Sequence, residues 1–218
     1  MTNKTQAHIR YRNQAGDIVP GVTTVLNVLN KPALVIWANQ LGLKGIDSTK
    51  YRDEMADIGT LAHYLILCEL RGDTPDTSDY SKQQIDQAEN AMLSYLEWAK
   101  GHTIEPIMVE EPLVSDTEGF GGTVDLFAKI DGVNTLVDFK TGKGLYPEFA
   151  YQVAAYQRLL SERFGALKPV QDVRLLRIGR EADEGFEEKR FGDLSREWGI
   201  FKACLTIYQL QANIRRGK

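Results

Sequence analysis

The sequence predicts a mixed α/β fold, in which helices flank a central mixed β-sheet and a helical region lies on its N-terminal side. Three observations support this. Apolar residues recur at helical spacing through residues 22–100. Period-two alternation with β-branched residues replaces that spacing over residues 104–139. Helix-like and strand-like segments then alternate to the C-terminus, as expected where helices pack on a mixed sheet.

The N-terminal region is expected to begin with a short hairpin and to continue as helices. Residues 8–19 alternate around a polar, glycine-containing turn at 13–16. Proline is favoured in the first turn of a helix and glycine just after its end, so Pro32 marks a start and Gly72 and Gly101 mark two ends. The expected helices cover residues 22–29, 32–43, 49–70 and 81–100.

The C-terminal half is expected to supply the sheet. Strands are predicted over residues 104–114, 119–130, 133–139, 170–178 and 185–191, and helices over 146–164 and 194–214. The chain shows no internal repeat and no low-complexity linker, so we expect one domain over residues 1–218. Its expected parts are a hairpin and helical region, a sheet with its helix, and a closing helix, which cover 1–103, 104–193 and 194–218.

Composition excludes several classes of protein. The 43% hydrophobic and 26% charged fractions are ordinary for a globular chain of 218 residues, which excludes wholesale disorder. No apolar run approaches the ~20 residues of a membrane helix, so we expect no membrane association. Residues 1–8 contain no apolar segment, so we expect no signal peptide and a cytoplasmic location. Cys68 and Cys204 are too few for a disulfide framework or a four-cysteine cluster, and we expect buried, inert thiols.

The charge is unevenly distributed along the chain. The total of −4 disfavours nucleic acid as a partner, since phosphate binders usually present a basic patch. However, residues 51–150 are strongly acidic, whereas the segments on either side are net basic. Chance and solvated helix faces are one interpretation. The other is a carboxylate-rich centre that holds a cation, flanked by segments that meet an anion.

A predicted hairpin brings three ionisable residues together. Asp131-Gly132 is a strong signal for a two-residue turn, which would place Asp125 opposite Asp138. A four-residue loop would place Asp125 opposite Lys140 instead. Both registers keep these three side chains on one face of the sheet, because side chains alternate with period two. The other face is expected to be apolar and to consist of Val124, Leu126, Ala128, Ile130, Val133, Val137 and Phe139.

Two opposed carboxylates repel each other unless something positive lies between them. A divalent cation with hard oxygen ligands, Mg²⁺ or Mn²⁺, suits this position. Lys140 would then point at the same site and could orient a nucleophile or stabilise developing charge. The alternative is a solvated sheet face on which Lys140 pairs with one aspartate. Glu110 and Glu111, which precede the hairpin, could supply a further acid for a second metal.

Four segments together resemble the PD-(D/E)XK nuclease superfamily, and within it the RecB-like exonuclease branch of bacteria and phages. They are Gly-Thr-Val-Asp125, Val-Asp138-Phe-Lys140-Thr-Gly-Lys143, Tyr-Gln152-Val-Ala-Ala-Tyr156 and, upstream, Gly59-Thr-Leu-Ala-His63. The opening Val19-Pro-Gly-Val-Thr-Thr-Val-Leu26 is also similar to the start of such domains, including mitochondrial genome-maintenance exonucleases. The resemblance covers roughly residues 19–160. It departs from the family in two respects: Val124 replaces the proline of the family name, and the four cysteines of iron–sulfur relatives are absent.

The resemblance implies a restriction-endonuclease-like core and a role for each matching residue. Asp125, Asp138 and Lys140 match the catalytic set. His63, Asp125, Asp138 and the backbone carbonyl of Phe139 match the metal ligands, for Mg²⁺ or Mn²⁺ and without an iron–sulfur cluster. The expected substrate-binding residues are Gln152, Tyr156, Thr141 and Lys143. From the residues alone, a core histidine at His63, a core tyrosine at Tyr156 and a solvated Gln152 are the alternatives.

The implied activity is metal-dependent hydrolysis of DNA phosphodiester bonds. The branch implies an exonuclease that acts on ends or single strands in recombination, repair or phage DNA processing. It would work in the cytoplasm of a bacterium or of a phage-infected host. A helicase or single-strand annealing protein would act in trans, since the chain contains no helicase motor. The alternatives are a non-catalytic nucleic-acid-binding or partner-binding module on a nuclease fold, and a structure- or sequence-selective endonuclease.

Overall fold

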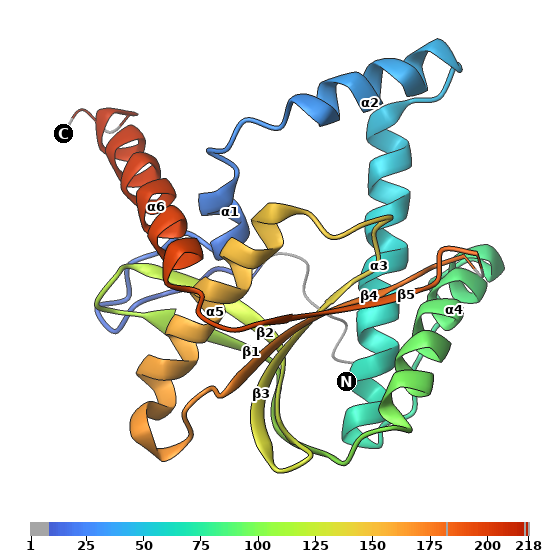
Figure 1. The fold of residues 1–218 in the computed structure, drawn as a ribbon. Helices are drawn as coiled ribbons and strands as arrows, with labels where there is room; N and C mark the ends of the chain where they lie inside the picture. Colours follow the sequence, from blue (N-terminus) through green and yellow to red (C-terminus); the bar gives the residue numbers. More distant parts are fainter. Residues whose placement is uncertain (1–8, 182, 216, 218) are drawn as a thin grey trace.

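The computed structural model describes residues 9–181, 183–215 and 217 (Figure 1). It contains a five-stranded mixed sheet flanked by helices, so the predicted fold class is confirmed. Residues 1–8, which bear on the expected absence of a signal peptide, and the first residue of the predicted 8–19 hairpin lie outside the described residues. The elements are α1 (Val22–Leu26), α2 (Pro32–Leu43), α3 (Ser48–Arg71), α4 (Lys82–Ala99), β1 (Ile104–Ser115), β2 (Phe120–Ile130), β3 (Val133–Lys140), α5 (Pro147–Phe164), the 3₁₀ helix η1 (Gly165–Leu167), β4 (Asp172–Ile178), β5 (Phe186–Phe191) and α6 (Ser195–Arg215).

The strands follow one another across the sheet in the order β1-β2-β3-β4-β5. The first three form an antiparallel meander, and α5 then crosses over so that β4 pairs parallel to β3. The last strand, β5, returns antiparallel to β4 at the edge. The β3–α5–β4 unit therefore places α5 directly after the strand that contains Asp138 and Lys140, as parallel pairing requires a crossover.

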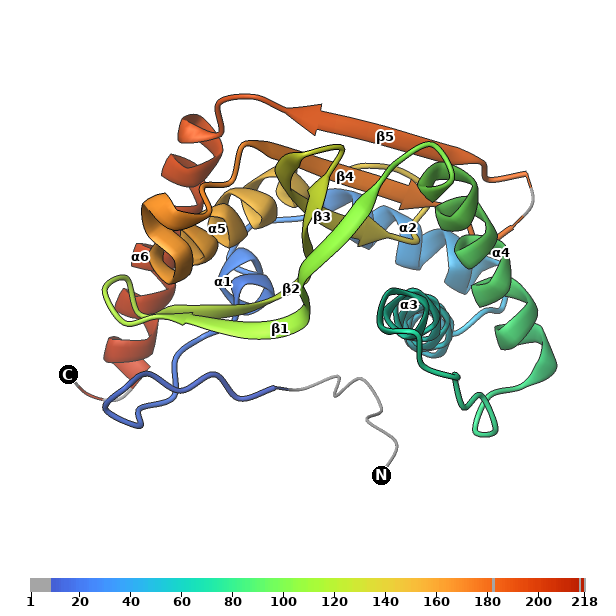
Figure 2. The ribbon, with the colours of Figure 1, turned by 90° about the horizontal axis from the view of Figure 1, so that it is seen from below.

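Helices cover both faces of the sheet (Figure 2). One core lies between the sheet and the helices α1, α5 and α6, and includes Phe120, Phe127 and Phe201. A second core lies between the opposite face and the helices α3 and α4, and includes Leu61 and Phe139. Because both faces are buried, the residues of the central strands are sheltered from water even where they are polar.

Local signals place α3 and α4. The side chain of Asp47 caps α3 by accepting hydrogen bonds from the backbone N–H groups of Thr49 and Lys50, at 2.8 and 3.1 Å. Gly72 ends this helix in the left-handed conformation, with φ of 71°. Ser81 forms a capping box with Gln84 at the start of α4. The Asp47 and Gly72 caps thus fix the two ends of α3, the helix that contains His63.

The β2–β3 hairpin has the predicted register. Asp131 and Gly132 both have positive φ, 51° and 86°, as a two-residue type I′ turn requires. Ile130 pairs with Val133, and the pairing continues to Leu126 opposite Val137. The two-residue turn is therefore correct, and the four-residue alternative is wrong.

Two expected elements differ from the structure. The predicted 8–19 hairpin is present in reduced form. Its turn closes at residues 13–16, and Arg12 and Ile18 form one isolated antiparallel bridge rather than extended strands, while the Tyr11 ring packs against Gly121 of β2. The helix expected over 22–29 ends at Leu26, since the next three residues bond three positions back rather than four.

Val124 lies on the face opposite to the predicted one. It belongs to the core under α5, whereas Leu126, Ala128 and Ile130 belong to the core under α3 and α4. The strict alternation expected along this strand is thus interrupted at Asp125, beyond the last β2–β3 pair. Val133 is also partly exposed rather than buried, since it borders the turn.

Two further expectations can be compared with the structure. Within the described residues, no helix combines the length and apolarity needed to cross a bilayer. Cys68 and Cys204 are both buried and unbonded to each other, as expected for core thiols.

Candidate active site

The carboxylates of the hairpin lie where the two strands separate. The last backbone pair of β2 and β3, counted from the turn, is Leu126 with Val137. Asp125 and Asp138 are the next residues along each strand. There the Phe139 N–H donates a 2.8 Å hydrogen bond to Oδ2 of Asp125. The side chain of Asp125 thus occupies the gap between the strands and holds the backbone of β3.

Asp138 and Lys140 form a buried ion pair. Nζ of Lys140 lies 2.5 Å from Oδ2 of Asp138, and the Asp138 side chain is only 1% exposed. The geometry of this contact is not that of a hydrogen bond. Oδ2 of Asp138 therefore lies next to a positive charge but accepts no hydrogen bond from any described residue. Lys140 also lies 5.0 Å from the ring centre of Phe149 on α5. Sequence reasoning missed this role of Phe149, because an aromatic residue on an amphipathic helix looks like ordinary core.

The alternative of a solvated sheet face is therefore wrong, although its pairing of Lys140 with an aspartate is correct. Burial raises the pKa of the Asp138 carboxyl to about 6; the ammonium of Lys140 opposes this shift, and the charge of Asp125 adds to it. Such a shift is typical of functional sites but also occurs in structural ion pairs.

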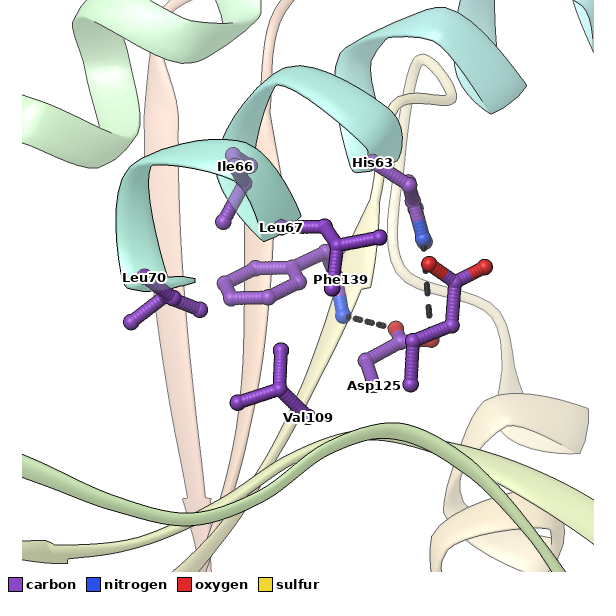
Figure 3. Close-up of a pocket in the computed structure, with 8 residues that line it drawn as sticks. His63, Ile66, Leu67, Leu70, Val109, Asp125 and Phe139 are labelled. Atoms are coloured by element: carbon purple, nitrogen blue, oxygen red, sulfur yellow. Dashed lines mark hydrogen bonds and ion pairs between the residues drawn. The ribbon is translucent and has the colours of Figure 1, made fainter. Parts of the chain in front are cut away.

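His63 projects from α3 toward Asp125 (Figure 3). Its Nδ1 lies 3.6 Å from Oδ1 of Asp125. Burial tends to lower the pKa of His63, but the Asp125 carboxylate outweighs burial and raises it. Burial likewise tends to raise the pKa of Asp125, but His63, Lys140 and the Phe139 N–H bring it below its ordinary value. This contact fits a metal ligand held ready by Asp125, and it fits equally the alternative of a histidine satisfied by a protein partner.

Glu110 of β1 lies beside this pair. A pocket is lined by polar groups of three elements and by apolar side chains of α3 and the sheet, namely His63, Ile66, Leu67, Leu70, Val109, Glu110, Asp125 and Phe139. Glu110 has a φ of 48°, a conformation that costs free energy in a residue with a side chain. Burial, and then the charge of Asp125, raise the pKa of Glu110. Glu111, the other acid considered, is exposed.

Gln152 and Tyr156 of α5 reach the same region from the opposite side. Nε2 of Gln152 donates a 2.7 Å hydrogen bond to the Tyr156 hydroxyl, and both residues are buried. The expectation of a shared helix face is confirmed, and the alternative of a solvated Gln152 is wrong. Burial, and then the charges of Asp138 and Asp125, raise the pKa of Tyr156 well above its ordinary value. Gly122 makes this packing possible, because a Cβ there would lie 2.6 Å from the Tyr156 ring.

The loop after β3 contains the two remaining predicted residues. Thr141 is half-buried and lies against α3, where a Cβ on Gly59 would come within 2.8 Å of its hydroxyl oxygen. Lys143 is exposed. The predicted Gly59–His63 segment therefore contacts the site at both ends, through Thr141 and through Asp125.

Replacing the glycines of two helices tests this contact. Gly42→Ala on α2 meets no atom within 4 Å, so better helix propensity should stabilise the protein by about 0.5–1 kcal/mol. Gly59→Ala on α3 should gain less than Gly42→Ala, or lose stability, because Thr141 must move. Urea unfolding of both variants measures the difference. An equal gain at the two positions would show that Thr141 does not restrain α3.

The donor chemistry of the site fits a divalent cation, but the side chains are held in pairs. Across the residues described, no group of three or more His, Cys, Asp or Glu is arranged to hold a metal ion. The donors are nevertheless two carboxylates and an imidazole, and Oδ2 of Asp138 is buried without a directed hydrogen bond. Oxygen and imidazole donors of this kind suit Mg²⁺ and Mn²⁺.

Asp138 should make the metal-free protein less stable as the pH rises from about 4 to about 6. A carboxyl whose pKa is raised by folding holds its proton more tightly in the folded state, so loss of that proton favours unfolding. Asp138→Asn removes this titration. Urea unfolding in EDTA should therefore show wild type losing free energy of unfolding relative to the variant across that range, with a constant difference above it. A difference that is independent of pH would contradict the raised pKa.

The fold and the site together define a mixed α/β protein with a buried aspartate–lysine centre between two helical layers. No family model matches the chain, and no curated protein matches it in sequence.

Three solved structures show limited similarity to the fold. An alkaline exonuclease (LHK-Exo) from Laribacter hongkongensis shares 16% identity at a TM-score of 0.37, over 75% of this chain and 92% of that one. LHK-Exo in complex with dAMP gives 13% identity and a TM-score of 0.37, over 75% and 91% of the two chains. The structure of SSO0001 gives 15% identity and a TM-score of 0.33, over 72% and 75%. None of these values assigns an activity to this chain.

Proposed function

We propose that this protein is a metal-dependent deoxyribonuclease of the PD-(D/E)XK superfamily that hydrolyses phosphodiester bonds. The observation that supports this most is the position of Asp125, Asp138 and Lys140 at the opening of the β2–β3 ladder. A buried carboxylate whose pKa is raised by burial costs stability, and a catalytic role accounts for that cost. The match of the surrounding segments to the superfamily motifs supports the same assignment.

The proposed metal ligands are Asp125, Asp138, His63 and the backbone carbonyl of Phe139. The two carboxylates supply the hard oxygen donors that Mg²⁺ and Mn²⁺ prefer, and the imidazole improves tolerance of Mn²⁺. When bound, the ion would polarise a phosphoryl oxygen and favour ionisation of the attacking water. The ion pair of Asp138 with Lys140 and that of Asp125 with His63 would keep these carboxylates compensated in its absence.

The protein's own side chains have distinct proposed roles. The Lys140 ammonium donates to the attacking water or to the phosphoryl oxygen that gains charge as the water oxygen bonds to phosphorus and an ester P–O bond breaks. The Gln152–Tyr156 pair, fixed by its 2.7 Å hydrogen bond, positions the strand that is cut. Thr141 and Lys143, in the loop after β3, contact the phosphates on either side.

The proposed substrate is DNA with a free end or a single-stranded region, as in the RecB-like branch. This assigns the protein to recombination, repair or phage DNA processing in the cytoplasm. Any helicase or annealing protein would act in trans. We expect modest affinity for DNA that falls with added salt, because the chain has a net charge of −4 and so has few positive charges with which to displace counterions.

A substrate panel tests the proposal. Linear and closed circular DNA, each single- and double-stranded, are incubated with the protein in Mg²⁺, in Mn²⁺ and in EDTA. The proposal predicts that linear DNA is degraded with either metal and is intact in EDTA. Cleavage of closed circles would identify an endonuclease instead. DNA binding that is equal with and without metal, and without cleavage under any condition, would identify a non-catalytic binding module.

A further inference from the structure

Glu110 lies opposite Asp125 across the β1–β2 pair. The two residues occupy the single position between two successive backbone pairs, which are Val109–Leu126 and Glu111–Val124. Both side chains also line the same pocket, together with His63. Carboxylates in facing positions on neighbouring strands repel each other, so this arrangement is unfavourable unless a positive charge lies near them.

Glu110 also marks the point at which β1 changes faces. Met108 and Leu113 are five positions apart and both belong to the core under α5, whereas strict alternation would place them on opposite faces of the sheet. Glu110 lies between them with a φ of 48°. The neighbouring strand β2 changes faces at Asp125 in the same way. The two strands therefore reverse their alternation at the level of the two acids.

Glutamate is an unfavourable residue for the backbone conformation at position 110. Positive φ is uncommon for residues with a side chain, and glycine and asparagine adopt it at least cost. A strand that needed only the reversal would be more stable with one of those two residues. Backbone strain of this kind is concentrated at functional sites, so it indicates a use for the Glu110 carboxylate.

The Glu110 carboxylate has no ionic partner in the part of the chain that the structure describes. Asp125 and Asp138 each contact a basic side chain, whereas none of the described residues forms a hydrogen bond or ion pair with the side chain of Glu110. Arg71, at the end of α3, donates a 2.7 Å hydrogen bond to the backbone carbonyl of Val109 instead. A half-buried carboxylate that faces another carboxylate is stabilised when a cation binds beside it.

We propose that Glu110 is part of the divalent-cation site and acts through water molecules on the ion; this inference rests on the proposed function. Among the described residues, no three His, Cys, Asp or Glu side chains are arranged as direct ligands. Mg²⁺ keeps several of its water molecules when it binds to carboxylates, and Glu110 supplies those waters with an acceptor opposite Asp125. Groups that hold a metal site in this indirect way change metal affinity by about 10–100-fold when they are replaced.

The stability of the protein in the presence of metal tests this role without DNA. Glu110→Gln keeps the length of the side chain but removes its charge, and Glu111→Gln makes the same change at the exposed neighbour. Urea unfolding is measured across a titration with Mg²⁺ and another with Mn²⁺, because an ion that binds the folded state raises the free energy of unfolding. Glu110→Gln should need about 10–100-fold more metal than wild type for the same stabilisation, whereas Glu111→Gln should match wild type. An equal requirement in Glu110→Gln and wild type, or an equal increase in Glu111→Gln, would overturn the proposal.

Asp125→Asn separates this inference from the proposed function. The substitution removes a proposed direct ligand and should abolish most of the stabilisation by metal. If wild type gains no stability from either metal, the cation site and the role of Glu110 both fail. If wild type and Asp125→Asn behave as expected but Glu110→Gln equals wild type, only the role of Glu110 fails.

Glu110→Asn distinguishes a role in metal binding from a role in the fold. Asparagine tolerates a positive φ, so the urea midpoint of this variant in EDTA should equal or exceed that of wild type. Its uncharged side chain should still raise the metal requirement by about 10-fold or more. A loss of stability in EDTA, or a metal requirement equal to that of wild type, would overturn the proposal.

Discussion

Asp138→Asn is expected to reduce DNA cleavage by about 10³-fold or more, equivalent to about 4 kcal/mol of lost transition-state stabilisation. The substitution keeps the shape of the side chain but removes the negative charge that we propose binds the metal. It also leaves Lys140 without the carboxylate that lies 2.5 Å from its ammonium. Initial rates on linear single-stranded DNA in saturating Mg²⁺ measure the effect.

The control for this variant is Asp131→Asn at the turn of the same hairpin. Asp131 has a φ of 51°, which asparagine tolerates well, and its side chain accepts a 2.9 Å hydrogen bond from the Thr103 N–H at the turn rather than facing the site. It should cleave DNA at close to the wild-type rate. Urea unfolding of both variants separates loss of activity from loss of structure. Asp138→Asn that is folded and cleaves at the wild-type rate would remove Asp138 from the mechanism.

Phe127→Ala is expected to destabilise the protein by about 3–5 kcal/mol, a large part of the stability of a domain of this size. Phe127 is fully buried on β2, and its ring centre lies 5.5 Å from that of Phe164 at the end of α5. Truncation removes contacts that bind α5 to the sheet and leaves a cavity. Urea unfolding at pH 7 measures the change in the free energy of unfolding.

Phe186→Ala is the matched control for the core variant. Phe186 begins the edge strand β5 and is 40% exposed, so its truncation should cost less than about 1 kcal/mol. A loss below about 1 kcal/mol at Phe127 would contradict the assignment of this residue to the core that holds α5 against the sheet.

Local signals in the sequence predicted the fold class and the key hairpin. The Asp131-Gly132 turn determines the pairing of β2 with β3 through residues next to each other in the chain, so its register could be predicted. The 8–19 segment could not be predicted in the same way. Its turn forms as expected, but the Tyr11 ring contacts Gly121, more than 100 positions away, and no local pattern indicates that contact.

The sequence indicated which side chains lie close together at the candidate site, but it did not indicate how deeply they are buried. Spacing placed Gln152 and Tyr156 on one face of α5, and the motif resemblance indicated His63. The burial of Asp138 depends on helices on both faces of the sheet, which no local pattern reports. The positive φ of Glu110 is likewise a property of the assembled strands, and only the presence of an acid upstream of the hairpin indicated a role.

The most direct test of the proposed mechanism compares Lys140→Ala with Lys129→Ala. Lys140 forms the buried ion pair with Asp138, whereas Lys129 is an exposed lysine of the same hairpin. Cleavage of linear single-stranded DNA in Mg²⁺ should fall by about 10²–10³-fold in Lys140→Ala and remain at the wild-type rate in Lys129→Ala. Equal cleavage by Lys140→Ala and wild type would contradict the account.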